Sequence, residues 1–234
     1  MTRRYFHPFL PESGGIVELS ADEAAHANRV MRVKPGDSIE LFDGKGCQAI
    51  ATVVKTTRNG CCCDAQSAVG VSREPERFVT VATALPKGDR AKAMVERLTE
   101  LGVKRLVPLL TDRTQGNRQL TSWCTKLERV TVEACKQCGR NELMEIAGPI
   151  ESDAFIANCD SRLRLIADPA GEPVRIGSDP AALDVSVLIG PEGGFSREEY
   201  TMAVDHGFAP FSLGPRIYRI ETAAIAMATL LIHS

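Results

Sequence analysis

The sequence predicts a small β-rich domain followed by a larger α/β domain with a mostly parallel sheet. Three observations support this fold class. The length of 234 residues suits one medium domain together with a small one. Short segments that alternate polar and apolar residues fill the first part of the chain, separated by Asp-Gly and Asn-Gly pairs that favour hairpins. From residue 77 onward, short apolar segments alternate with amphipathic helical ones, which is typical of strands joined by covering helices.

The first domain is expected to span residues 1–72. Ser20 and Glu23 fit a capping box, so a helix is predicted over residues 21–32. Several short strands and one helix in so short a segment suggest a small β-barrel. Its strands are predicted over residues 38–42, 47–57 and 61–69, and SREPE (72–76) is the expected linker.

The second domain is expected to span residues 73–234. One helix is predicted after the PKGD loop and another around Trp123, because apolar residues recur there at helical spacing. Ser196 and Glu199 fit a second capping box, which begins a helix that Gly207 ends. The strands are predicted over residues 77–85, 105–110, 162–168, 184–190 and 210–214.

The composition is that of an ordinary globular protein, with 44% apolar and 25% charged residues. No apolar stretch reaches the roughly 18 residues that a membrane helix needs, and the N-terminus has no apolar signal-like segment. We therefore expect a cytoplasmic protein with no membrane partner. Cys135 and Cys138 form one CxxC pair without the second pair of a zinc ribbon, so we also expect no metal.

Charge is unevenly distributed along the chain although the net charge is only −2. Residues 73–140 carry 14 basic and 8 acidic side chains, whereas residues 141–234 carry 6 and 14. Such asymmetry is compatible with a basic face for a polyanion and equally with a solvated surface.

The loop GPEGG (190–194) follows the apolar segment VSVLI and precedes the helix that Ser196 caps. Ligands of open α/β sheets bind at the carboxyl ends of strands, and glycines allow the backbone to approach a ligand closely. A tight turn that needs glycine for geometry alone is the alternative. The chain has neither the P-loop nor the dinucleotide glycine pattern, so a nucleotide site of those kinds is excluded.

A second loop of the same kind follows the next predicted strand, in FSLGPRIYRIETAA. Arg216 and Arg219 stand there in an otherwise acidic region. Arginines beside a glycine loop suit a phosphate or a developing anion, although ion pairs with nearby carboxylates would also account for them. Two consecutive loops of this kind predict a shared cleft.

The segments LIGPEGGFSREE and SLGPRIYRIETAA resemble the C-terminal signatures of SPOUT methyltransferases, and most closely the uridine-N3 methyltransferase family of 16S ribosomal RNA. The resemblance extends through HANRVMRVKPGDSIELFDGKG, similar to that family's PUA-like domain, and through LPKGDRAKAMVERLTELGVKRLVPLLTDRT and EACKQCGR. It implies a deep C-terminal trefoil knot, S-adenosyl-L-methionine as cofactor, a homodimer, and 16S rRNA in the small ribosomal subunit as partner. The chain departs from the family pattern at Lys136, Met144, Tyr218 and Ile220.

The resemblance also implies roles for individual residues. Arg219 or Arg216 is expected to stabilise the uracil anion or a neighbouring phosphate. Glu192 or Glu221 is the candidate base, unless these carboxylates orient an arginine or cap a helix. The residues expected to bind the cofactor are Leu188, Gly190, Pro191, Glu192, Gly193, Gly194, Ser212, Leu213, Gly214, Ile217 and Tyr218. Those expected to meet RNA phosphates are Arg29, Arg32, Lys34, Lys87, Arg90, Arg113 and Arg140.

Two other functions remain open at this stage. Another SPOUT enzyme, such as a ribose 2′-O-methyltransferase, would share the glycine loops, although the PUA-like half and the ETAA ending favour the uridine-N3 family. A non-catalytic RNA-binding assembly factor would not need intact glycine loops. A hydrolase that uses Glu192 has no accompanying Ser/His or metal-ligand pattern.

Overall fold

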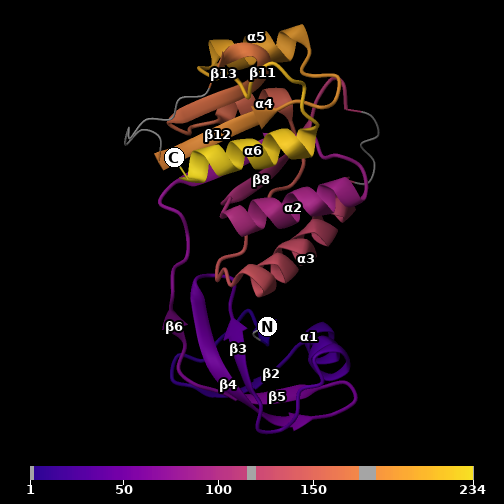
Figure 1. Cartoon of the computed structure of the whole chain (residues 1–234), viewed down its shortest axis with the longest axis vertical. Coiled ribbons are helices and arrows are strands. Elements are labelled where there is room, and N and C mark those ends of the chain that lie inside the picture. Colours follow the sequence, from indigo (N-terminus) through magenta and orange to yellow (C-terminus); the bar gives the residue numbers. More distant parts are fainter. Residues whose placement is uncertain (1–2, 115–119, 174–182, 234) are drawn as a thin grey trace. The chain divides into compact units, whose positions relative to one another are not determined.

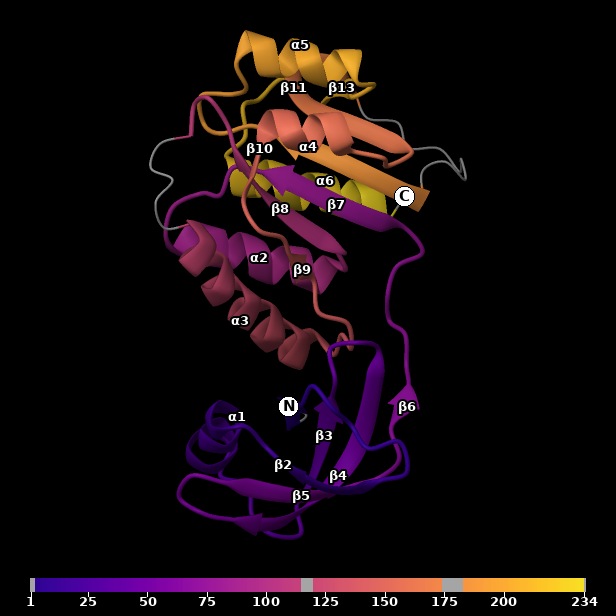
Figure 2. The same cartoon turned by 180° about the vertical axis from the view of Figure 1, so that it is seen from behind.

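The computed structural model describes residues 3–114, 120–173 and 183–233, which form two compact units (Figures 1 and 2). The first unit contains Met1–Glu74 and Val132–Leu143, and the second contains Pro75–Thr131 and Met144–Ser234. The sequence led us to expect two continuous domains that divide after residue 72. In the structure, the first segment of the first unit ends at Glu74, close to that point. The unit also contains a later segment, Val132–Leu143.

The first unit is built on a mostly antiparallel six-stranded sheet with the strand order β1-β3-β4-β5-β2, in which β6 pairs with β4. Both predicted hairpins are confirmed, since β3 pairs antiparallel with β4 and β4 with β5. The first strand runs parallel to β3, and the sequence analysis predicted neither it nor β2. The strands are β1 (Arg4–Phe6), β2 (Gly15–Glu18), β3 (Ser38–Phe42), β4 (Cys47–Thr56), β5 (Cys61–Ala65) and β6 (Val69–Gly70).

The predicted first helix begins as expected and then changes from an α-helix to a π-helix. Helix α1 (Ala21–Ala25) starts at Ser20, whose hydroxyl accepts the Glu23 N–H at 3.3 Å. The Glu23 carboxylate instead accepts hydrogen bonds from Lys136, so the predicted capping box is only half formed. A π-helical turn η1 (His26–Val30) continues α1, and Arg32 follows with a φ of 50°.

In the strands of the first unit, every second side chain points into the core. In β5, Cys61 and Cys63 are buried and Cys62 is only partly so, as the sequence predicted for three consecutive strand residues. Burial raises the pKa of the Cys63 thiol to about 12, and that of Cys135 likewise to about 12. These thiols are therefore protonated at neutral pH and serve as small core residues.

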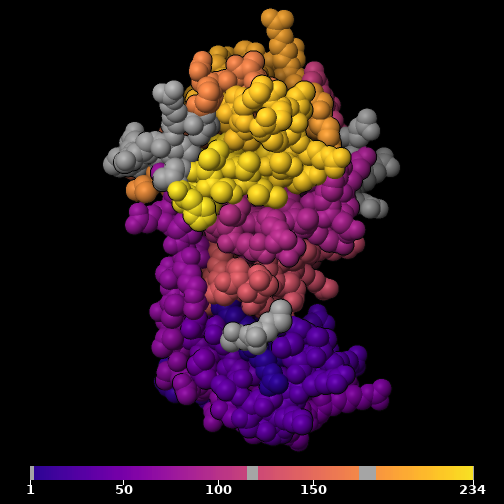
Figure 3. Space-filling view, in the orientation of Figure 1, coloured from indigo at the N-terminus to yellow at the C-terminus, as the bar shows by residue number. Residues whose placement is uncertain are grey.

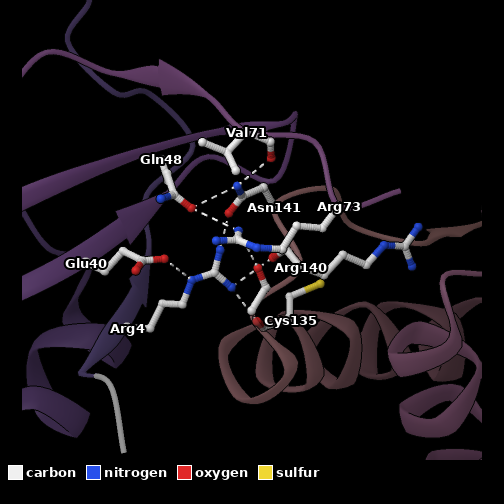
Figure 4. Close-up of polar contacts among 9 residues, drawn as sticks. Arg4, Glu40, Gln48, Val71, Arg73, Cys135, Arg140 and Asn141 are labelled. Atoms are coloured by element: carbon white, nitrogen blue, oxygen red, sulfur yellow. Dashed lines mark hydrogen bonds and ion pairs between the residues drawn. The ribbon is translucent and has the colours of Figure 1, made fainter. Parts of the chain in front are cut away.

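Arg4 ties the later segment of the first unit to its sheet (Figure 4). The buried guanidinium donates to Glu40 at 2.6 Å, to the Arg140 carbonyl at 2.8 Å, and to the Cys135 carbonyl and the Asn141 side chain. The carbonyls at the end of a helix lack intrahelical partners, and a cation there is favoured by the helix dipole. Arg4 thus donates hydrogen bonds to carbonyl groups at and just after the C-terminal end of the long helix Leu120–Cys138.

The second unit contains a parallel seven-stranded sheet with the order β10-β8-β7-β12-β11-β13, in which β9 pairs with β8. Every pairing in it is parallel, as the alternation of strands and helices predicted. The strands are β7 (Phe78–Thr83), β8 (Arg105–Leu110), β9 (Glu145–Ile146), β10 (Ile150–Glu151), β11 (Leu163–Pro173), β12 (Asp184–Ile189) and β13 (Ala209–Ser212).

Helices cover both faces of this sheet (Figures 1 and 2). On one face, α2 and α6 pack on residues such as Val79 and Val187. On the other face, α4 and α5 pack on residues such as Ala82 and Leu188. The helices are α2 (Asp89–Leu101), α3 (Leu120–Cys138), α4 (Ser152–Asn158), α5 (Arg197–Asp205) and α6 (Ile220–His233).

Helix α6 buries one side and leaves an apolar outer side. Ala224, Met227 and Leu231 are fully buried in the core, whereas Leu230 is exposed and Ile225 is partly exposed. In the space-filling view (Figure 3), the C-terminal part of the chain, in yellow, occupies a broad area of the visible face of this unit. No helix among the described residues is long and apolar enough to span a membrane.

Candidate functional site

A cavity of about 450 Å³ opens where the chain leaves three neighbouring strands of the parallel sheet, β11, β12 and β13. It brings together the two glycine loops that the sequence singled out. The lining residues are Ala167, Asp168, Pro169, Ile189, Gly190, Pro191, Glu192, Gly193, Gly194, Phe195, Phe211, Leu213, Gly214, Arg216, Ile217, Tyr218, Arg219, Ile220 and Ala223. The predicted shared cleft is therefore present.

The first loop, residues 190–195, turns sharply after β12. The Gly194 N–H donates to the Pro191 carbonyl at 2.8 Å, and Gly194 has a φ of 71°. A Cβ atom at Gly190 would lie 3.1 Å from the Phe195 nitrogen, so a side chain there would push the turn open. Both the left-handed backbone and the close packing require glycine, and they leave main-chain groups facing the cavity.

A buried carboxylate supports this loop from behind. Ser196 and Glu199 form the predicted capping box, with hydrogen bonds of 3.1 Å and 2.7 Å. The other oxygen of Glu199 accepts the Ser152 hydroxyl at 2.6 Å and the Asp112 N–H at 3.1 Å. One side chain therefore fixes the start of α5, the start of α4 and the loop that follows β8.

The second loop, residues 213–219, closes on itself through side chains. The Ser212 hydroxyl accepts the Gly214 N–H at 3.1 Å, and Gly214 has a φ of 101°. The Tyr218 hydroxyl donates to the Leu213 carbonyl at 3.3 Å and accepts from Arg216 at 3.1 Å. Tyr218, which departs from the family pattern, thus holds the loop in its bend.

Asp168 completes the cavity wall from β11, and the sequence analysis did not identify it. It accepts the Tyr200 hydroxyl at 2.6 Å and the Ala170 N–H at 2.9 Å. The hydrogen bond to Asp168 raises the pKa of Tyr200 to about 12. In the sequence, Asp168 is marked only by the Asp-Pro pair at the end of an apolar segment. The sheet order is needed to show that this strand adjoins the two glycine loops.

Two carboxylates and one arginine meet at the edge of the cavity. Arg90, in the first turn of α2, lies 3.4 Å from Glu192 and 3.7 Å from Glu221. Glu192 belongs to the first loop and Glu221 to the first turn of α6. Arg113 also contacts the first loop, where it donates to the Gly193 carbonyl.

Most of the residues predicted to bind the cofactor line the cavity, and two do not. Leu188 is fully buried in β12, and its side chain packs in the core beneath α4 and α5. Ser212 lies under the second loop, where it bonds to the Gly214 N–H. Of the predicted catalytic residues, Arg216, Arg219 and Glu192 line the cavity, and Glu221 lies beside it.

The residues predicted to contact RNA fall into three groups. Arg29, Arg32, Lys34 and Lys87 are exposed. Arg90 and Arg113 contact the first loop of the candidate site. Arg140 is only 4% exposed, and its Nε donates to Glu74 at 2.8 Å. This burial removes Arg140 from the predicted RNA contacts, because a phosphate cannot reach a guanidinium held inside the first unit.

A family model described as an RNA methyltransferase domain matches residues 73–232, and one described as an RNA methyltransferase PUA domain matches residues 19–65. The first match alone covers more than half of the chain. The chain belongs to this RNA methyltransferase family. The family resemblance drawn from the glycine loops is confirmed, and so is the PUA-like character of the N-terminal region.

Relatives within the family carry a more specific name. The ribosomal RNA small subunit methyltransferase E of Synechocystis sp. is 31% identical and aligns over 93% of this chain and 74% of its own length. The protein of the same name from Buchnera aphidicola (subsp. Schizaphis graminum) is 26% identical over 98% of this chain and 94% of its own length.

Two solved structures of methyltransferases resemble the whole chain with a TM-score of 0.90. One is Lpg2936 from Legionella pneumophila in complex with the cofactor SAM, 33% identical over 99% of this chain and 97% of that one. The other is ribosomal RNA small subunit methyltransferase E from Neisseria gonorrhoeae bound to S-adenosyl methionine, 25% identical with the same coverage.

Proposed function

We propose that this chain is an S-adenosylmethionine-dependent methyltransferase that acts on N3 of a uridine in 16S ribosomal RNA. The observation that carries the proposal is the cavity formed by the two glycine loops, in a chain whose structural relatives hold this cofactor. The names of the curated relatives support the small-subunit RNA as substrate. The choice of uridine N3 rests on the resemblance of the two loop sequences.

The residues of the cavity fit this cofactor. The volume of about 450 Å³ lies in the range of roughly 300–1,000 Å³ common for small-ligand sites. Apolar side chains, among them Ile189, Phe211 and Ala223, would face the adenine ring, and main-chain groups of the glycine loops would bond its polar edge. Asp168 would accept hydrogen bonds from hydroxyl or ammonium groups of the cofactor.

The chain's own residues must prepare the nucleophile. S-adenosylmethionine supplies a methyl group activated by a sulfonium. Uracil N3 carries a proton in its neutral form, so the base must be held unpaired, deprotonated and in line with that methyl group. Removal of the proton leaves negative charge on the uracil ring, which nearby cations stabilise.

Arg219 and Arg216 are the cations best placed for this task. Both line the cavity and are exposed, and neither forms an ion pair with a carboxylate in the described part of the chain. Glu221 is the favoured proton acceptor, because its Oε2 atom is buried and accepts no hydrogen bond from any described residue. Glu192, which is 61% exposed, is the second choice.

Three further properties belong to the same proposal. The two loops would lie in a deep trefoil knot of the SPOUT type. The partly apolar outer side of α6 would bury against a second copy in a homodimer. Exposed cations, including Arg29, Arg32, Lys34 and Lys87, would bind RNA phosphates of the small subunit in the cytoplasm.

The test is nucleoside analysis of 16S rRNA from a strain that lacks the gene. We expect loss of one N3-methyluridine, restored by the wild-type chain and not by Arg219→Ala, which should still bind the cofactor in calorimetry. Loss of a ribose-methylated nucleotide instead would show that the enzyme modifies the sugar. Full activity of Arg219→Ala would overturn the role of that residue.

A further inference from the structure

Arg90 contacts both the first loop of the candidate site and the helix that follows the second loop. Its Nη2 atom lies 3.4 Å from Glu192 Oε1, in the loop after β12. Its Nη1 atom lies 3.7 Å from Glu221 Oε2, in the first turn of α6 that directly follows the second loop. The two nitrogens of one fork therefore face two carboxylates, one in the first loop and one at the start of α6.

The two contacts differ in their exposure to solvent. Glu192 is 61% exposed, whereas Glu221 is 16% exposed. Water screens the contact with Glu192 more strongly than the contact with Glu221. Glu221 Oε2 has no hydrogen bond from any described residue, and at 3.7 Å the Arg90 guanidinium provides charge without a hydrogen bond. This carboxylate oxygen is thus held beside a cation, and no described residue donates a hydrogen bond to it.

We propose that Arg90 is a positioning residue that fastens the GPEGG loop to the start of α6, and so holds Glu221 and the cavity walls in register for methyl transfer. The effect on the reaction rests on the proposed function. The fastening itself is a property of the ligand-free protein. This role replaces the contact with an RNA phosphate that the sequence suggested for Arg90.

The two roles make different demands on the side chain. A phosphate contact needs a positive charge, which lysine also supplies. A bridge between two carboxylates suits a fork with two nitrogen donors, whereas a lysine would have to divide a single nitrogen between the same two carboxylates. Arg90→Lys should therefore preserve RNA affinity in either case, but it should weaken the bridge.

The first experiment uses hydrogen exchange of the ligand-free full chain and requires no activity. Arg90→Ala should increase exchange in residues 190–195 and also in the first turn of α6. Arg113→Ala removes a contact with Gly193 alone, so it should affect only residues 190–195. Arg97→Ala, on the same helix as Arg90, removes an ion pair with Glu100 of that helix; it is the control and should change neither segment. Unchanged exchange at α6 in Arg90→Ala overturns the proposal, whether or not the chain methylates uridine.

The second experiment measures methyl transfer to small ribosomal subunits that lack the modification. Because displaced reacting groups cost rate, we expect kcat to fall about 10- to 100-fold in Arg90→Ala, with KM for RNA nearly unchanged. Arg90→Lys should recover only part of that loss, and the melting temperature should change by no more than about 4 °C. A raised KM, a salt slope lower by about one, and full recovery in Arg90→Lys would instead establish the phosphate role and overturn ours.

Discussion

The hydrogen bond from Tyr200 to Asp168, in the cavity wall, can be followed through the titration of Tyr200. It accepts the Tyr200 hydroxyl at 2.6 Å, and this bond raises the pKa of Tyr200 from 10 to about 12. A raised pKa means that the folded protein keeps a proton that the unfolded chain has lost. The contribution to stability is therefore complete below pH 10 and is lost as the pH rises from 10 through about 12.

We expect Asp168→Asn to lower the pKa of Tyr200 towards 10, because the Tyr200 hydroxyl would lose its hydrogen bond to a carboxylate and the phenolate would no longer face a negative charge. NMR of tyrosine labelled with ¹³C at Cζ would follow each ring separately. Tyr5 is an internal control, since burial alone is the main cause that raises its pKa to about 12. A Tyr200 pKa that stays near 12 in Asp168→Asn would show that the hydrogen bond to Asp168 is not the cause.

Individual residues could be predicted where their chemistry is distinctive. Gly190, Gly194 and Arg216 could be identified because glycine loops directly follow two predicted apolar strands, and arginines accompany the second loop. Asp168 did not, because one Asp-Pro pair is common in turns. Lys136 departs from the family pattern, and its role is visible only in the structure. It donates to both oxygens of Glu23, at 3.2 and 3.0 Å, and to Glu133 at 3.0 Å.

At the scale of secondary-structure elements, the N-terminus of α5 is the key position, because the Glu199 side chain joins this helix to two other segments of the chain. The carboxylate is almost fully buried and accepts hydrogen bonds from Ser196, Ser152 and Asp112. A buried acceptor that satisfies several donors cannot be removed without leaving those donors unpaired. The glycine loop that precedes α5 thus depends on one side chain that does not line the cavity.

We expect Glu199→Ala to lower the free energy of unfolding by about 3 kcal/mol, since a cap is lost and buried donors are left without partners. Glu198→Ala changes an exposed residue of the same turn and should cost less than about 1 kcal/mol. Urea unfolding of both variants provides the comparison. Equal losses in the two variants would mean that the helix dipole, and not the buried network, is responsible.

Elements with strong periodicity were predicted well, and short ones were not. The strands that became β7, β8 and β12 and the helices α2 and α3 were all expected from their apolar patterns. Strands β1 and β2 contain three and four residues, too few for a period to be visible. Strand β11 continues to Pro173, beyond the expected end at residue 168, because a bulge allows it to pair with β13 again.

On the scale of the whole molecule, the first unit is made from two separate segments of the chain. Residues 132–143 come from the end of α3 and the turn after it. Their carbonyls and side chains accept hydrogen bonds from Arg4 (Figure 4). Arg140 in turn donates to Glu74. No local pattern could reveal this, because the contacts join residues more than 60 positions apart.

We therefore expect a fragment of residues 1–74 to lack a cooperative unfolding transition. Arg4 and Glu40 would remain, but the buried guanidinium would lose the partners that lie in residues 132–143. The same fragment joined to residues 132–143 by a flexible glycine–serine linker should regain the transition. Thermal unfolding followed by circular dichroism distinguishes the two, and a stable, cooperative 1–74 fragment would contradict this account of the unit.

The two-segment construction of the first unit also affects the order of events during synthesis. Domains commonly fold one after another as they leave the ribosome, with the N-terminal one first. Here residues 1–74 emerge early, yet the residues that complete their polar core follow only after a long part of the second unit has been made. The N-terminal sheet therefore lacks part of its polar core until Leu143 has emerged.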